Sequence, residues 1–577
     1  MNAAQLLAHF DRLAEAPGAV PRLRRFILDL AVRGKLVEQD SAEEPARRQL
    51  ADIGAARALR VGDSKPRQRK VVTQNDVSDL PFPLSSGWSM ATLAELTDVL
   101  NGRAYAKNEL LDTGTPVLRV GNLFTSKHWY YSNLNLDQDK YCDNGDLIFS
   151  WSASFGPFIW NGPKVIYHYH IWKLPLHSET RLDKHYLYRF LLQQTQQIKD
   201  SGHGVSMIHM TKEKMEKLLV PVPPLAEQHR IVAKVDELMA LCDQLEAAQQ
   251  ERERRRDRLA AASLQRLNQP AEANSAADQT ESTETHQQAQ REQQKDHAHF
   301  HLQNLHRLTT RPEHIKAMRQ TFLNLAVRGL LVSQRTQDEP AAAILEAIQL
   351  NKAQLVRSGA IPKEKAVAAT ASVTFPLPSL WAAVRLGEIC NLVTSGSRGW
   401  AEFYAKSGPK FLRAQNIRFG RLRLDELACV NPPAKSEGAR TQLQPGDLLI
   451  VITGAGVTNP ALLDHDLGEA YVSQHVALVR PSSTTLSKWL LLCLMAGPSG
   501  RDELVERAYG AGKPGLNLDN IRSLNTPLPP LAEQHRIVAK VDELMALCDQ
   551  LEAQLTQSQT DSRRLLEAVL DAALAPA

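Results

Sequence analysis

Apolar residues recur at alternating steps of four and three in two long stretches of the chain. The first series is Ile231, Val235, Leu238, Cys242 and Leu245, and the second is Ile537, Val541, Leu544, Cys548 and Leu551. This spacing is typical of the a/d seam of a coiled coil and predicts two long helices. Each stretch opens on a proline pair, and proline suits the start of a helix because the N–H that it lacks would have no partner there.

The two stretches belong to an internal repeat. The segment from Pro223 to Ala247 recurs unchanged from Pro529 to Ala553. The shorter sequence LAVRG also occurs twice, at Leu30 to Gly34 and at Leu325 to Gly329, so each half has its own helical arm. Because the two seams are identical, we expect the long helices to pair with each other as an antiparallel intramolecular coiled coil. Two unrelated surface helices are the alternative.

A globular domain precedes each long helix. Short apolar runs of strand type follow a Gly-Asp-Leu turn in both, at Leu147 to Trp151 and at Leu448 to Ile452. Other anchors also correspond, including Leu118-Arg119 with Leu412-Arg413, whereas the sequence between the anchors differs. We therefore expect an α+β protein in which one mixed α/β fold is used twice, with pseudo-twofold symmetry and a different ligand surface on each copy.

The chain divides into seven parts by composition and pattern. They are a helical arm with its connector, 1–81; a first domain, 82–222; a first long helix, 223–267; a linker, 268–299; a second arm with its connector, 300–374; a second domain, 375–528; and a second long helix, 529–577. The linker has no Val, Ile, Leu, Met, Phe, Trp or Tyr and is rich in Gln, so we expect a disordered tether.

Composition adds three expectations. The six cysteines form no C-x-x-C pair and no apolar run reaches membrane length, which favours a cytoplasmic protein. His170 and His475 lie at equivalent positions without companion metal ligands, so they are interpreted as core or edge histidines, and no metal is expected. The net charge is only +4, so a surface for a polyanion must come from local clustering.

Catalytic motifs are incomplete. Asn431-Pro432-Pro433-Ala434 lacks the aromatic residue that would stack on a flipped base, so a turn is the better interpretation. The segment Gly510 to Lys513 resembles a phosphate loop, but Arg507 stands where a glycine is needed and Pro514 replaces the Ser or Thr that would bind magnesium. We expect no catalytic residue and no bound cofactor in this chain.

One segment has the composition of a nucleic-acid surface. From Arg398 to Arg423 it carries seven Arg or Lys residues against the single acid Glu402, interleaved with aromatic residues. Guanidinium groups can neutralise phosphates or bind guanine, and Gln or Asn can pair with adenine. The candidate DNA-binding residues over both domains are Arg103, Arg119, Asn122, Lys127, Arg398, Arg413, Gln415, Asn416, Arg418, Arg421 and Lys513. An ordinary charged surface is the alternative.

Two differing domains, each followed by a Pro-Pro-Leu-x-Glu-Gln-x-x-Ile-Val helix start, resemble the DNA specificity subunit of a type I restriction-modification enzyme. The resemblance spans nearly the whole chain, and the doubled helix starts at Pro223 to Val232 and Pro529 to Val538 are its most specific part. It implies two target recognition domains, each reading one half of a bipartite, asymmetric sequence in double-stranded DNA. It implies no catalysis by this chain.

The resemblance also implies partners. Two modification subunits would bring S-adenosylmethionine, and restriction subunits would bring ATP and Mg²⁺. The repeated helix starts predict where the modification subunits dock, at Glu227, Gln228, Arg230, Glu533, Gln534 and Arg536. An assembly scaffold that presents two identical docking surfaces and binds no DNA is the alternative function.

Overall fold

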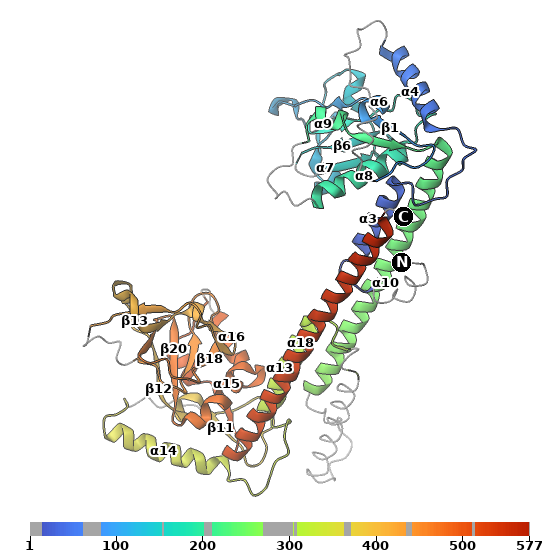
Figure 1. The fold of residues 1–577 in the computed structure, drawn as a ribbon. Helices are drawn as coiled ribbons and strands as arrows, with labels where there is room; N and C mark the ends of the chain where they lie inside the picture. The colour runs from blue at the N-terminus through green and yellow to red at the C-terminus, as the bar shows by residue number, and fades with distance from the viewer. Residues whose placement is uncertain are drawn as a thin grey trace, which may run out of the picture. The chain divides into compact units, whose positions relative to one another are not determined.

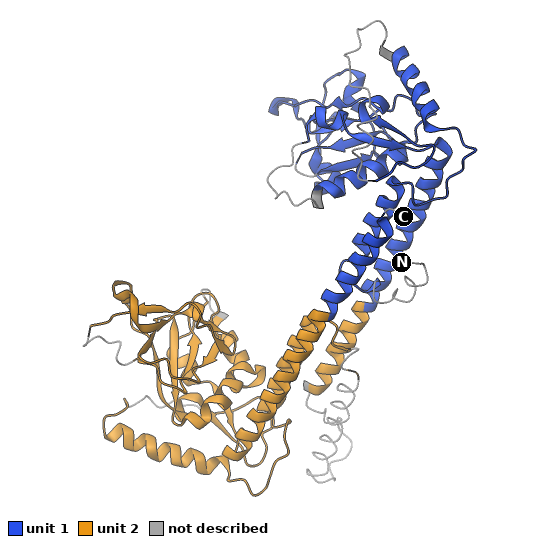
Figure 2. Ribbon diagram, in the orientation of Figure 1, with its two compact units in different colours: residues 1–252, 558–577 blue, residues 253–557 orange. Residues whose placement is uncertain are grey.

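The computed structural model describes residues 14–61, 82–152, 155–200, 210–268, 304, 308–362, 371–433, 441–509 and 514–575. The chain divides into two compact units, coloured separately in Figure 2: unit 1 comprises residues 1–252 and 558–577, and unit 2 comprises residues 253–557. Apart from Asn268, the predicted linker lies outside the described residues. The segment Gly510 to Lys513, which includes the candidate DNA-binding residue Lys513, also lies outside them. No helix in the described part of the chain is long and apolar enough to cross a membrane.

Unit 1 begins with the helical arm, and its domain combines a run of short strands with helices (Figure 1). The elements are α3 (Ala19–Val32), α4 (Ala46–Val61), β1 (Ser89–Thr92), α6 (Leu93–Leu96), β2 (Leu100–Asn101), β3 (Thr115–Leu118), α7 (Val120–Phe124), β4 (Tyr130–Ser132), β5 (Tyr141–Cys142), β6 (Leu147–Ser150), β7 (Gly156–Ile159), β8 (Val165–Tyr167), β9 (Ile171–Lys173), α8 (Lys184–Asp200), α9 (Lys212–Glu216), β10 (Leu219–Val222) and the start of α10 (Leu225–Asn268).

Unit 2 repeats this order. Its elements are α13 (Pro312–Val327), α14 (Ala341–Arg357), β11 (Ala382–Arg385), β12 (Cys390–Ser395), η4 (Trp400–Phe403), β13 (Tyr404–Leu412), η5 (Ala414–Asn416), β14 (Ile417–Arg418), β15 (Arg421–Leu422), β16 (Ala428–Val430), β17 (Leu448–Val451), β18 (Pro460–Leu462), β19 (Ala470–Val472), β20 (Val476–Pro481), α15 (Ser487–Met495), α16 (Arg501–Tyr509), α17 (Leu518–Arg522), β21 (Asn525–Leu528) and the start of α18 (Leu531–Leu574).

The two domains have matching sheet topologies. The four-stranded order β2-β9-β6-β7 in the first corresponds to β12-β20-β17-β18 in the second, and all pairs in both are antiparallel. A second sheet, β4-β3-β8-β5 or β16-β13-β19, contains one parallel pair in each domain, β3 with β8 and β13 with β19. The α+β prediction is confirmed, and the anchors found in the sequence lie at equivalent places in the two topologies.

A two-stranded ribbon and a buried tryptophan fix each domain on its long helix. The ribbon β1-β10 leads into α10, and β11-β21 leads into α18. Trp88 Nε1 donates to Glu227 Oε2 at 3.0 Å, and Trp381 Nε1 donates to Glu533 Oε2 at 3.1 Å. Burial raises the pKa of both carboxyls. The first turn of each long helix is therefore part of its own domain's interior.

Each of the identical seams is covered inside its own unit, so the expectation that the two seams pair with each other is not borne out. Ile231, Val235 and Cys242 share a buried cluster with Val20, Ile27 and Leu28 of α3, the arm helix of the same half. In unit 2 the seam residue Cys548 lies with Ile315 and Met318 of α13. In unit 1 the arm helix thus supplies the apolar partner that heptad spacing had assigned to the other long helix, and in unit 2 the arm helix shares this role with the end of α10.

Each long helix begins in one unit and ends in the other unit. Helix α10 ends in unit 2, and helix α18 ends in unit 1. In unit 1, Leu566 and Val569 of α18 are buried against Ala16 and Ala19. In unit 2, Leu264 and Leu267 of α10 share a cluster with Leu551 and Leu555 of α18. The tail of one long helix therefore packs beside the arm of each unit.

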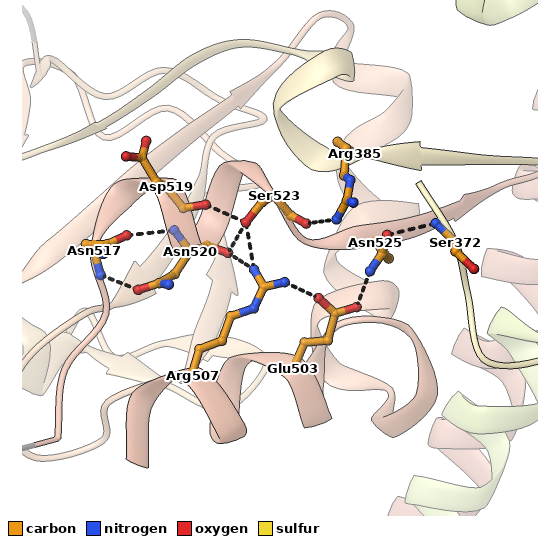
Figure 3. Close-up of polar contacts among 9 residues, drawn as sticks. All are labelled: Ser372, Arg385, Glu503, Arg507, Asn517, Asp519, Asn520, Ser523 and Asn525. Atoms are coloured by element: carbon orange, nitrogen blue, oxygen red, sulfur yellow. Dashed lines mark hydrogen bonds and ion pairs between the residues drawn. The ribbon is translucent and has the colours of Figure 1, made fainter. Parts of the chain in front are cut away.

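A polar network holds the end of the second domain together (Figure 3). Arg507 on α16 donates to Glu503 Oε2 at 2.7 Å and to Ser523 Oγ at 2.8 Å. Asn525 of β21 donates to the same Glu503 carboxylate at 2.8 Å and accepts from the Ser372 backbone N–H. Arg507, noted in the sequence only as a residue that excludes a phosphate loop, has a structural role that ties α16 to the strand leading into α18.

Candidate nucleic-acid interface

Arg119 and Arg413 occupy the same place in the two domains. Each follows the strand with a parallel neighbour and is the N-cap residue of a short helix, α7 or η5. Arg119 is exposed and its guanidinium lies 4.9 Å from the centroid of the Tyr130 ring. Arg413 is half-buried, and its Nε has no hydrogen-bond partner among the described residues. Both are cations at the C-terminal end of an interior strand, where a phosphate or a guanine could be bound.

Asn122 and Asn416 hold the turn that positions these arginines. Asn122 Oδ1 accepts from the Arg119 N–H at 3.1 Å, and Asn416 Oδ1 accepts from the Arg413 N–H at 3.0 Å. The Asn416 amide also donates to the Arg423 carbonyl at 3.1 Å, and its side chain is only 1% exposed. The predicted pairing of Asn416 with adenine is therefore wrong, because the amide is buried and used internally.

A three-residue connection lies beside each of these arginines. His168, Tyr169 and His170 join β8 to β9, and Ser473, Gln474 and His475 join β19 to β20. The His168 N–H donates to the Leu118 carbonyl and the Ser473 N–H to the Leu412 carbonyl, both at 2.9 Å. Because Leu118 and Leu412 directly precede the two arginines, the connection and the arginine are adjacent in both domains.

In the second domain these elements surround a pocket of about 360 Å³. Its lining includes Trp400, Tyr404, Phe411, Arg413, Gln415 and the connection Ser473 to His475. Trp400 and Phe411 are buried with ring centroids 4.9 Å apart, whereas Tyr404 is 49% exposed. Trp400 Nε1 and Ser473 Oγ are buried without a hydrogen-bond partner among the described residues. The pocket combines aromatic walls with unused polar groups.

In the first domain the equivalent place is occupied by rings. The ring centroids of Tyr169 and His170 lie 3.9 Å apart, and those of His168 and Tyr105 lie 6.4 Å apart. Burial, with smaller contributions from His170 and Arg119, lowers the pKa of His168 to about 4, so this imidazole is neutral at pH 7. The first domain therefore presents a more aromatic surface beside its arginine.

The remaining candidates of the second domain lie at its surface. Arg418 and Arg421 face each other across the β14-β15 hairpin, and both are exposed, as are Arg398 and Gln415. Phe419 at the hairpin tip is partly exposed, and the Arg501 guanidinium lies over one face of its ring, 5.1 Å from the centroid. The hairpin thus offers two cations on a short, supported turn.

The remaining candidates of the first domain differ in availability. Lys127 is exposed. Arg103 forms two hydrogen bonds with Glu109, at 2.8 and 3.1 Å, which raises the pKa of the arginine and lowers that of the carboxyl. Arg103 would have to exchange this ion pair for a phosphate, so it is a weaker candidate than Arg119.

Four of the six predicted partner-binding residues are not at the surface. Glu227, Gln228, Glu533 and Gln534 are each at most 1% exposed, because they form the domain attachment described above. Gln228 Nε2 donates to the Pro223 carbonyl and Gln534 Nε2 to the Pro529 carbonyl. This part of the prediction is wrong.

The two predicted arginines are already ion-paired. Arg230 pairs with Glu43 and Arg536 with Asp338 of their own arms. They therefore tie each arm to its long helix.

Sequence reasoning included Trp400 and Tyr404 among the aromatic residues of the Arg398 to Arg423 segment, but it missed the pocket residues Ser473 and Gln474. The available signal was the equivalence of His170 and His475, which was noted but interpreted as structural. Each histidine lies directly before a strand, His475 is exposed, and its Nδ1 is 2.5 Å from Thr453 Oγ1. Among the described residues no cluster of His, Cys, Asp and Glu could hold a metal ion.

Comparison with known proteins matches both domains. Residues 85–253 and 378–558 fit the type I restriction modification DNA specificity domain, and together they make up more than half of the chain. The EcoEI specificity subunit of a type I restriction enzyme from Escherichia coli is 28% identical, over 96% of this chain and 94% of the relative. The EcoAI specificity subunit from the same species is 27% identical over the same shares.

Solved structures are similar to the chain at lower identity. The HsdS subunit from Thermoanaerobacter tengcongensis is 19% identical, with 86% of this chain and 98% of that one covered and a TM-score of 0.41. A chain from a structure of a type I R-M system is 18% identical, with 86% and 99% covered and a TM-score of 0.44. On the match to both domains, the chain belongs to the type I restriction-modification specificity subunits.

Proposed function

We propose that this chain is the non-catalytic, DNA-reading subunit of a type I restriction-modification complex, and that each domain reads one half of a bipartite, asymmetric site in double-stranded DNA. The observation that carries the proposal is the pair Arg119 and Arg413. The two arginines share one backbone position, each held by an asparagine, while the side chains around them differ between the domains. A common frame with different surroundings suits two different half-sites.

Methylation-site mapping tests this proposal. Genomic DNA from cells with and without the gene, in the presence of the partner subunits, should differ by methylation at one bipartite sequence with a fixed gap. A complex that assembles but methylates no defined sequence would favour the assembly scaffold without DNA binding.

The docking surface for the modification subunits is the exposed side of the repeated helices. Alanines recur there every seventh residue: Ala226, Ala233, Ala240 and Ala247 on α10, and Ala532, Ala539, Ala546 and Ala553 on α18. Leu241 is 51% exposed and its counterpart Leu547 is 47% exposed. The same small apolar surface occurs twice, so the expected stoichiometry is two modification subunits to one chain.

Native mass spectrometry checks this stoichiometry. Leu241→Glu and Leu547→Glu should each remove one modification subunit, because each places a charge on one copy of the surface. Glu506→Gln, an exposed change on α16 that lies outside the repeated helices, is the control. A one-to-one complex for the unaltered chain at saturating partner contradicts the docking proposal and leaves DNA reading untouched.

S-adenosylmethionine belongs to the modification subunits in this proposal, and ATP and Mg²⁺ to the restriction subunits. This chain would bind none of them. The two long helices would run antiparallel as the spacer between the half-sites, with the arm helices inserted along their seams. Equilibrium dialysis of the chain alone with S-adenosylmethionine should show no retention.

A further inference from the structure

The connections His168 to His170 and Ser473 to His475 share one backbone arrangement. Beyond the bonds to Leu118 and Leu412, the Ile171 N–H donates to the His168 carbonyl at 2.9 Å and the Val476 N–H to the Ser473 carbonyl at 3.0 Å. The carbonyl of the last residue of each connection accepts a hydrogen bond from the residue that follows the neighbouring strand. The His170 carbonyl accepts from the Trp151 N–H, and the His475 carbonyl accepts from the Ile452 N–H. Each connection is thus bonded at its start, across its turn and at its end.

In each domain a glycine packs directly against the backbone of the connection or of the residue before it. A Cβ on Gly102 would lie 2.4 Å from the His168 carbonyl oxygen, and a Cβ on Gly396 would lie 2.0 Å from the Val472 carbonyl oxygen. Real Cβ atoms do not approach backbone oxygens so closely, so these positions require glycine. In both domains the backbone of the connection is therefore held against the glycine that follows β2 or β12.

The side chains differ at two of the three positions. The third residue is histidine in both domains, but His168 and Tyr169 are replaced by Ser473 and Gln474. Gln474 and Arg413 line the same pocket, and the buried Ser473 hydroxyl lies there without a partner among the described residues. In the first domain Tyr169 is exposed, and its ring lies tilted against the rings of His168 and His170. One backbone thus carries polar groups in one domain and rings in the other.

We propose that these two connections are the specificity-determining elements of their domains, with positions 168 and 169 reading one half-site and positions 473 and 474 the other. The inference rests on the proposed function. In the second domain Arg413 and Gln474 would read purines, because guanidinium matches the guanine N7 and O6 acceptors and the amide matches adenine N6 and N7. In the first domain Tyr169 would make apolar contact with a thymine methyl group.

Exchange of the differing side chains tests the inference. The full chain, assembled with its modification subunits, is given a library of DNA duplexes with randomised half-sites, and the methylated sequences are read. Gln474→Tyr should change the preferred base at one or two adjacent positions of one half-site by about tenfold or more, the scale of one lost bidentate contact. Tyr169→Gln should do the same in the other half-site. The gap length should stay constant in both.

Two controls keep the test decisive. Gln474→Ala introduces no bulk and should relax the same positions, so it replaces Gln474→Tyr if the larger side chain lowers the thermal unfolding temperature. Glu506→Gln, an exposed change on α16 of the same domain, should leave both half-sites unchanged.

The possible failures are distinguishable. A folded Gln474→Ala variant that selects the wild-type sequence with undiminished discrimination overturns this inference while the proposed function stands. A change that appears equally in both half-sites also overturns it. Selection of no sequence by the unaltered chain overturns the proposed function and this inference together.

Discussion

The two recognition domains share their sheet topology and the contacts that support it, which we call the frame. They differ in the residues that surround Arg119 and Arg413, which we call the edge. The frame repeats down to single interactions, as in the Gly-Asp-Leu turn, where Asp146 accepts from Lys173 at 2.6 Å and Asp447 accepts from Arg480 at 2.7 Å. The edge does not repeat, since rings beside Arg119 are replaced by a pocket beside Arg413. The comparison teaches that the fold is maintained by a small set of equivalent backbone and charge contacts, and that the chemistry facing outward can change without disturbing them.

The largest expected effect comes from the attachment of each domain to its helix. Trp88→Ala or Trp381→Ala removes a large buried side chain and leaves a buried carboxyl without its donor, which should destabilise that unit by about 3–5 kcal/mol. Hydrogen exchange should show loss of protection only in the unit that carries the change. Equal loss of protection in both units would mean that the two attachments are not independent, and the comparison of separate frames would fail.

Loss of the ion pair at the Gly-Asp-Leu turn should destabilise the second domain more than the first. Asp447 is 1% exposed and accepts two hydrogen bonds from Arg480, whereas Asp146 is more accessible to water. Arg480→Ala should therefore cost about 3 kcal/mol of unfolding free energy, because a buried charge loses its partner. Lys173→Ala should cost clearly less. Chemical denaturation of the two variants measures the difference, and equal losses would contradict the burial argument.

DNA binding should depend equally on the two arginines at the N-caps. Arg413→Ala and Arg119→Ala should each weaken specific binding by about 1–3 kcal/mol and reduce the salt slope of the affinity by about one unit if the guanidinium meets a phosphate. Arg103→Ala should weaken binding less, because Glu109 already holds that side chain. Affinity measured over a salt series is the readout. An unchanged slope for both cap arginines would place the phosphate contacts elsewhere.

The smallest expected effect is a pH dependence shared by the two attachments. Burial raises the pKa of Glu227 and Glu533, so the folded chain binds more protons than the unfolded chain between the ordinary carboxyl pKa and the raised one. This contribution to stability is complete below the ordinary pKa and is lost as pH rises through the raised value. Thermal unfolding over a pH series should therefore be flatter in Glu227→Gln than in the wild type, whereas Glu237→Gln should follow the wild type.

The sequence predicted the repeated α+β frame because its anchors are local. A Gly-Asp-Leu turn and a proline-led helix start are recognisable from a few adjacent residues, and they lie at equivalent places in the two domains. The partner of the seam Ile231 to Leu245 was not predictable in the same way. Heptad spacing indicates that an apolar face will be covered, but it does not indicate by which helix. The arm helix and the other long helix both offer apolar residues that could cover it.

The candidate site shows the same limit. Arg413 was found because basic residues cluster along the chain, and Arg119 because it is the equivalent residue of the first domain. Ser473 lies far from Arg413 in sequence and comes next to it through the parallel strand pair β13-β19. Asn416 was misassigned because composition cannot distinguish an amide that caps a turn from one that faces a ligand. Glu227 and Gln228 were misassigned because a repeated sequence was interpreted as a repeated surface, although it also encodes a repeated interior.

Unit 1 contains residues from both ends of the chain, and this determines when its folding can be completed during synthesis. Arg22 pairs with Glu567 at 2.8 Å, and Lys35 donates to the Ala575 carbonyl at 2.8 Å. Between Arg252 and Ser558 the ribosome adds the whole of unit 2, which at about 5–20 residues per second takes roughly 15–60 s. The half that is made first is therefore finished last, and until then Ala16 and Ala19 lack the cover that Leu566 and Val569 of α18 provide.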